Sequence, residues 1–186
     1  MGTKRIEQIR TNALVAKELH TKKLRGRNGY KIALNVMTII VPILFLTAQY
    51  WAKSTQLEFV INFVASLGSV GLLCMAIIAI IIDLDGKIIK HTIGVKSNIY
   101  VATESIKLME ENEESKLGWF YTYVAEVDAA DADSLSGVSG KEKMAAFREA
   151  LKQLFPGESS IVCPVCNASP YIYEAGSCQV CGNKPK

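Results

Sequence analysis

Two uncharged apolar runs, separated by a short polar segment, constrain the fold of this chain more than any other feature. The first covers residues 32–52, between Lys31 and Lys53. At 1.5 Å per residue it spans roughly 30 Å, the thickness of the hydrocarbon core of a bilayer. The second covers residues 59–82 and ends at Asp83. The sequence predicts two transmembrane helices, because a soluble core helix is seldom so long and apolar on every face. The alternative is a buried hairpin in a soluble protein, but the rest of the chain is too polar to wrap one.

The distribution of basic residues predicts how this hairpin is oriented. Residues 1–31 contain nine Lys and Arg, whereas the connection between the runs, residues 53–58, contains Lys53 alone. Since basic residues stay on the cytoplasmic side, we expect a multi-pass membrane protein with both termini in the cytoplasm. A cleaved signal peptide is the alternative for the first run. Its leader and its apolar run are too long for that, and no small-residue cleavage site follows.

Size and composition narrow the function classes. With 186 residues and a net charge of +3, the chain has too little material outside the membrane for a large enzyme core. It shows no nucleophile–base set, phosphate loop or paired carboxylates, so we expect no catalytic residue and no enzyme. The apolar runs contain no charged or titratable Asp, Glu, Lys, Arg or His, which argues against a proton-coupled transporter. The C-terminal region has few basic residues, which argues against a nucleic-acid partner.

The N-terminal region, residues 1–29, reads as a basic amphipathic cytoplasmic helix, with apolar residues at spacings of three and four over residues 3–25. Two roles fit: the helix lies on the inner leaflet, or it packs against another cytoplasmic helix. In the first role, the basic residues that face lipid are Lys22, Lys23, Arg25 and Arg27. Gly26, Asn28 and Gly29 predict a bend before the transmembrane hairpin domain, residues 30–85.

Two stripes are candidates for helix packing and oligomerisation. In the second apolar run, mostly small residues recur at spacings of four and three: Ala65, Ser69, Leu72, Ala76 and Ala79. They fit packing within one hairpin or packing between subunits of a homo-oligomer. A coiled-coil-like helix is predicted over residues 86–127, with a heptad seam. The seam comprises Ile88, Thr92, Val95, Ile99, Ala102, Ile106 and Met109. Its partner is the N-terminal helix of the same chain or the same helix of a neighbouring subunit.

The segments that follow are shorter. Residues 117–124 fit a helix or a strand equally. Residues 128–140 are small, acidic and glycine-containing, as expected of a linker. An amphipathic helix is predicted over residues 141–156, opened by a capping box of Ser139 and Glu142. His91 and Tyr100 flank the heptad seam, and we interpret them as packing residues.

The C-terminal segment, residues 160–186, holds the clearest chemical signal. Cys163, Cys166, Cys178 and Cys181 form a CxxC-x11-CxxC pattern, in which two thiolate-bearing turns can meet to give tetrahedral S₄ coordination, the arrangement that structural Zn²⁺ prefers. Asn and Gly follow the pairs where tight turns need them, and the intervening Tyr-Ile-Tyr has strand character. We predict a zinc ribbon with a closed structural site. Iron in a rubredoxin-like knuckle and disulfides are the alternatives.

The predicted fold class is therefore an all-α membrane protein, a two-transmembrane helical hairpin with cytoplasmic helices, plus a small C-terminal zinc ribbon. The order of a basic helix, a tight hairpin and a returning helix with His91 and Tyr100 resembles the SLATT family over roughly residues 5–110. That resemblance implies a membrane-disrupting, pore-forming effector of bacterial antiviral defence. The cysteine spacing resembles that of mobilome CxxC-x11-CxxC proteins, which are carried on mobile elements.

Two functions follow as hypotheses. The first is an oligomeric inner-membrane effector that opens or perforates the membrane on a cytoplasmic signal, with the ribbon docking a sensor or partner protein. The second is a membrane-anchored zinc-ribbon adaptor or assembly factor that recruits a cytoplasmic partner. Membrane lipid is a partner in both.

Overall fold

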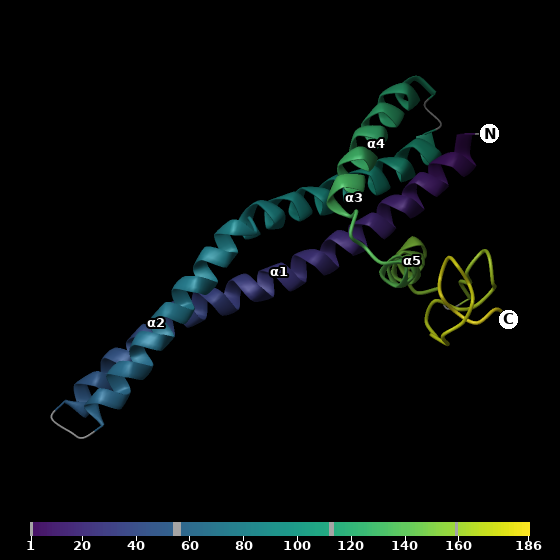
Figure 1. Ribbon diagram of the computed structural model, residues 1–186. Helices are drawn as coiled ribbons and strands as arrows, with labels where there is room; N and C mark the ends of the chain where they lie inside the picture. Colours follow the sequence, from purple (N-terminus) through teal and green to yellow (C-terminus); the bar gives the residue numbers. More distant parts are fainter. Residues whose placement is uncertain (1, 54–56, 112–113, 159) are drawn as a thin grey trace. The chain divides into compact units, whose positions relative to one another are not determined.

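The computed structural model describes residues 2–53, 57–111, 114–158 and 160–186. It is all-helical over these residues, with no strand and a C-terminal segment of turns (Figure 1). The helices are α1 (Gly2–Ala52), α2 (Glu58–Ile81), α3 (Leu84–Glu111), α4 (Glu114–Ser134) and α5 (Gly140–Leu154). The chain divides into two compact units, residues 25–89 and residues 1–24 with 90–186. We call them the apolar unit and the helical unit.

The apolar unit contains the two helices that are long and apolar enough to cross a membrane. Within it, α2 returns alongside the second half of α1 (Figure 1), and a Cβ built on Gly68 would lie 2.6 Å from the Phe45 ring. Of the most apolar window in each helix, 0% and 6% of the residues are buried. Apolar surface of this extent needs a cover that these two helices do not give each other.

The small stripe of α2 is split by this pairing. Ala65 is buried, Leu72, Ala76 and Ala79 are half-buried, and Ser69 is exposed. Gly68, half-buried against Phe45, provides the close approach to α1 that the stripe predicted. Ala65, Leu72, Ala76 and Ala79 are therefore the residues of the stripe that can pack within one hairpin. Packing between subunits stays a prediction, and Ser69 is the residue of the stripe that is exposed for it.

The helical unit is built around the beginning of α1, α3 and α4. Its main core contains buried residues of all three: Ile6, Ala13, Val101, Ala102, Leu108, Phe120, Val124 and Val127. The N-terminal helix thus packs against other helices, which is one of its two predicted roles. Residues 117–124 are helical and contribute the fully buried Phe120.

The buried face of α3 differs from the predicted heptad seam. It comprises His91, Gly94, Asn98, Val101, Ser105 and Leu108, again at alternating spacings of three and four. Of the predicted seam, Ala102 is buried, Val95, Ile106 and Met109 are half-buried, and Ile99 is 45% exposed. The seam predicted from apolar residues is the stripe next to this buried face. The buried face includes polar His91 and Asn98, which can be buried because they form hydrogen bonds, and a hydropathy pattern does not indicate such bonds.

Two helices extend past their predicted ends. α1 is continuous through Gly26, Asn28 and Gly29, since a helix tolerates such residues at about 1 kcal/mol each when its flanks are strongly helical. α4 continues to Ser134, so residues 128–134 of the predicted linker are helical. Its alanines favour the helix, and Val127 and Asp131 are buried. Residues 54–56 of the predicted membrane loop and residues 112–113 of the predicted long helix lie outside the described residues.

The start of α5 agrees with the prediction. The Ser139 side chain accepts from the backbone N–H of Glu142, and the Glu142 side chain accepts from the backbone N–H of Ser139. This capping box satisfies two donors at the helix N-terminus. Leu19, Val138 and Ala146 then form a small buried cluster that joins α1 to α5.

Candidate metal centre

Each CxxC pair lies on a tight turn of the same design. The backbone N–H of Asn167 donates to the Cys163 carbonyl, and that of Gly182 donates to the Cys178 carbonyl, both at 2.9 Å. Asn167 and Gly182 have φ values of 56° and 74°, in the left-handed region that favours these two residue types. The residues that follow the cysteine pairs therefore perform the turn role that the sequence predicted.

The two turns bring all four thiols to one point. The four sulfur atoms lie within 4.8 Å of one another, and the Sγ atoms of Cys166 and Cys181 are 3.4 Å apart. Tetrahedral coordination with Zn–S distances near 2.3 Å places sulfur atoms about 3.8 Å apart. All four cysteines are buried. The cluster thus fits one metal ion with four sulfur ligands, which leaves no coordination position for a substrate.

The electrostatics of the four thiols favour a bound cation. The backbone N–H of Cys181 lowers the pKa of the Cys178 thiol to about 6, although burial opposes that shift. Burial raises the pKa of Cys181 to about 12 and also raises that of Cys166. Since several buried thiolates at one point repel one another, only a bound cation allows all four to ionise.

Backbone hydrogen bonds hold the second turn against the rest of the segment. Ala175 and Asn183 form an isolated antiparallel bridge, and the N–H of Lys184 donates to the Glu174 carbonyl at 2.8 Å. A Cβ on Gly176 would overlap the Lys184 backbone, so this approach requires glycine. The predicted strand at Tyr171–Tyr173 is wrong. Those residues form a turn in which the Asn183 side chain donates to the carbonyls of Ser169 and Ile172.

The ribbon packs against α5 through the same cysteines. Its buried cluster combines the four thiols with Leu151 and Leu154 of α5 and with Ile161. The Arg148 guanidinium donates to the Cys181 carbonyl and lies 4.1 Å from the centroid of the Tyr173 ring. The sequence did not reveal Arg148 as part of the site, because a single arginine on an amphipathic helix has no pattern of its own.

Comparison with known families agrees with this geometry. A family model described as "Mobilome CxxCx(11)CxxC protein" matches residues 3–184. The chain belongs to the mobilome CxxCx(11)CxxC family. The match includes the helices as well as the cysteine segment, so in this family the helices and the ribbon occur as one unit of sequence. No curated protein and no solved structure matches the chain.

The basic residues predicted to face lipid have protein partners where the structure gives their contacts. Lys22 and Lys23 approach Glu142 of α5 at 3.5 and 3.2 Å. Within the apolar unit, Arg27 donates to the Lys87 carbonyl at 3.5 Å. That these residues and Arg25 face lipid stays a prediction.

A buried polar cluster that the sequence did not predict joins three helices and is formed by His20, His91, Asn98 and Asp131. The sequence did contain one sign of this cluster. The chain has two histidines in total, and each stands at a position on a helix face where an apolar residue is expected.

Proposed function

We propose that this protein is an oligomeric inner-membrane effector of a bacterial defence or mobile-element conflict system, which forms a pore or disrupts the membrane on a cytoplasmic signal. The observation that carries this proposal is the pair of long apolar helices with almost no buried residues. In water that surface would drive aggregation, whereas in a bilayer it is solvated. The membrane-facing part then consists of α2 and the second half of α1, and both termini lie in the cytoplasm.

The remaining parts have supporting roles in this proposal. Exposed Ser69 is the position at which neighbouring hairpins approach closely. The ribbon, a closed four-sulfur module, provides a rigid surface for a sensor or partner protein instead of catalysis. The resemblance to SLATT proteins and membership in a mobilome family both support a role in conflict between mobile elements and their hosts.

Dye release from liposomes tests the proposal. We expect purified protein, reconstituted with its activating signal or at high density, to release a small dye, and Ser69→Leu to abolish release by preventing close approach. The matched control is Cys74→Leu, an exposed small residue five positions along α2, about 140° around the helix. Release that is absent in the wild type, or lost equally in both variants, would contradict the effector.

A specific observation favours the second candidate, a membrane-anchored adaptor. A groove of about 780 Å³ lies between the start of α1, α5 and the ribbon, with Phe147, Leu151 and Ile161 in its lining. Phe155 and Val162, which also line it, are exposed at 43% and 45%. Exposed apolar residues beside a groove are typical of a protein-binding surface. Stable insertion in liposomes without any dye release would favour this adaptor.

A further inference from the structure

The two histidines of the chain meet inside the helical unit. His20 of α1 and His91 of α3 are 71 residues apart in sequence, and their Nδ1 atoms are 2.8 Å apart. Their exposed fractions are 1% and 2%. A Cβ on Gly94 would lie 2.5 Å from Cε1 of the His20 ring, so glycine at this position is what admits the imidazole. The pair is therefore built into the packing of α1 against α3.

Asp131 of α4 fixes the protonation of this pair. Its Oδ1 lies 2.8 Å from His20 Nε2, and its Oδ2 accepts from the Asn98 side chain at 2.7 Å. Asn98 in turn donates to the Gly94 carbonyl at 3.0 Å. A carboxylate that accepts on both oxygens requires a proton on His20 Nε2. The second nitrogen of His20 then faces the Nδ1 of His91.

This geometry limits how many protons the pair holds. A hydrogen bond between two Nδ1 atoms needs one proton on that line, supplied by either ring. The pair remains bonded with zero or one positive charge. If both imidazoles are protonated, two N–H groups face each other at a distance suited to one hydrogen bond, and two buried cations lie side by side.

Two ion pairs involve the helices that carry this cluster. Lys90 of α3 is 3.7 Å from Asp133 of α4, and Lys23 of α1 is 3.2 Å from Glu142 of α5, so these charges engage each other at the rim.

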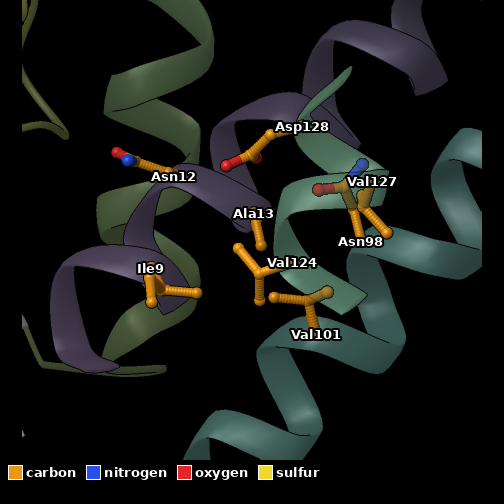
Figure 2. Close-up of a pocket in the computed structure, with 8 residues that line it drawn as sticks. All are labelled: Ile9, Asn12, Ala13, Asn98, Val101, Val124, Val127 and Asp128. Carbon is orange, nitrogen blue, oxygen red and sulfur yellow. The ribbon is translucent and has the colours of Figure 1, made fainter. Parts of the chain in front are cut away.

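Asp128, one turn before Asp131, lines a cavity of about 20 Å³ with Asn98 and Asn12 (Figure 2), which is room for about one water. Burial, followed by the charge of Asp131, raises the pKa of the Asp128 carboxyl, so Asp128 is a poor second counter-ion in acid.

We propose that His20 and His91 form an acid-sensitive latch: one shared proton joins α1 to α3, with Asp131 tying both to α4, and a second proton opens the junction. This inference concerns the helical unit alone and holds whichever membrane function is correct. The direction follows from proton linkage. Unfolded histidines both bind protons below about pH 6.5, while the closed pair holds only one. The open state therefore gains about tenfold for each pH unit of acidification below that value.

Hydrogen exchange on the full chain in nanodiscs, made without a histidine tag, tests the latch. Between about pH 7.5 and pH 5.5, protection around His20 and His91 should fall about tenfold relative to the core around Phe120. In His91→Asn the side-chain amide can turn so that its oxygen accepts from a protonated His20 Nδ1. The closed state then binds as many protons as the open state, so protection should not fall. Asp133→Asn, which removes an exposed carboxylate two positions from Asp131, should behave as the wild type.

Nitrogen-15 histidine NMR on the wild type provides a readout that needs no variant, because the label reports on these two residues alone. We expect one protonated and one bare Nδ1 at neutral pH, and full protonation of both rings in step with the loss of protection. Full protonation with protection intact would overturn the latch. So would an equal acid loss in His91→Asn, or a second metal equivalent per chain that disappears in that variant.

Discussion

At the scale of single residues, the metal centre depends on atoms that have no substitute. Asn167 and Gly182 adopt left-handed conformations that aim two cysteine pairs at one point, and the sulfur atoms fill the centre of the ribbon's own core. A serine at any of the four positions keeps the size of the side chain but loses the soft thiolate ligand.

The first prediction concerns metal content. Cys178→Ser should reduce bound zinc from about one equivalent per chain to near zero, because three sulfur ligands and a hydroxyl leave the tetrahedral site incomplete. Cys74→Ser, at the exposed thiol of α2, is the matched control and should retain the metal. Elemental analysis of both proteins gives the answer, and retention of zinc by Cys178→Ser would refute the assignment.

At the scale of elements, α5 packs against the ribbon, and contacts at the N-terminus of α5 hold this helix in place. Ser139 and Glu142 cap the helix, while Glu142 also reaches Lys23 of α1 at 3.2 Å. At the other end, Leu151 and Leu154 pack on the cysteine cluster. Fraying of the first turn of α5 would therefore weaken the capping box and the contact between Glu142 and Lys23.

The second prediction concerns this cap. Ser139→Ala should lower the free energy of unfolding of the helical unit by about 1 kcal/mol, while Ser139→Thr, which keeps the hydroxyl, should cost much less. Denaturant unfolding of the full chain in detergent, followed by fluorescence of Trp119, measures both. Equal losses in the two variants would show that the cap does not contribute.

The third prediction concerns the pH dependence of the same cap. Hydrogen bonding from Ser139, followed by Lys23, lowers the pKa of Glu142 to about 2. Because the folded pKa is depressed, the stabilisation is present above the unfolded value of about 4.3 and is lost as pH falls towards 2. Glu142→Gln should remove this part of the acid dependence. A wild-type stability that is flat through this range would contradict the assignment.

At the scale of the whole molecule, the described parts rely on different sources of stability. The helical unit has an apolar core shared by α1, α3 and α4, whereas the ribbon has few buried apolar residues besides its cysteines and those of α5. A segment of this size gains most of its folding free energy from its metal. The apolar unit buries 0% and 6% of the residues in its most apolar windows, so it has little core of its own.

The fourth prediction separates these sources. Chelation of the metal should expose the backbone amides of Asn167 and Gly182 to hydrogen exchange, while the helix content measured by far-UV circular dichroism changes little. Readdition of zinc should restore protection. Loss of most helical signal on chelation would instead show that the metal supports the entire helical unit.

The sequence by itself determined the parts whose signal is local. Two uncharged runs of membrane length, a capping box and a fixed spacing of four cysteines each specify a structure through neighbouring residues, and the helices, the cap and the cluster lie where those patterns place them. The continuity of α1, the extension of α4 and the true buried face of α3 depended on tertiary contacts. A helix face is buried by what packs on it, and His20 and Asp131, distant in sequence, are what allow polar His91 and Asn98 to be buried.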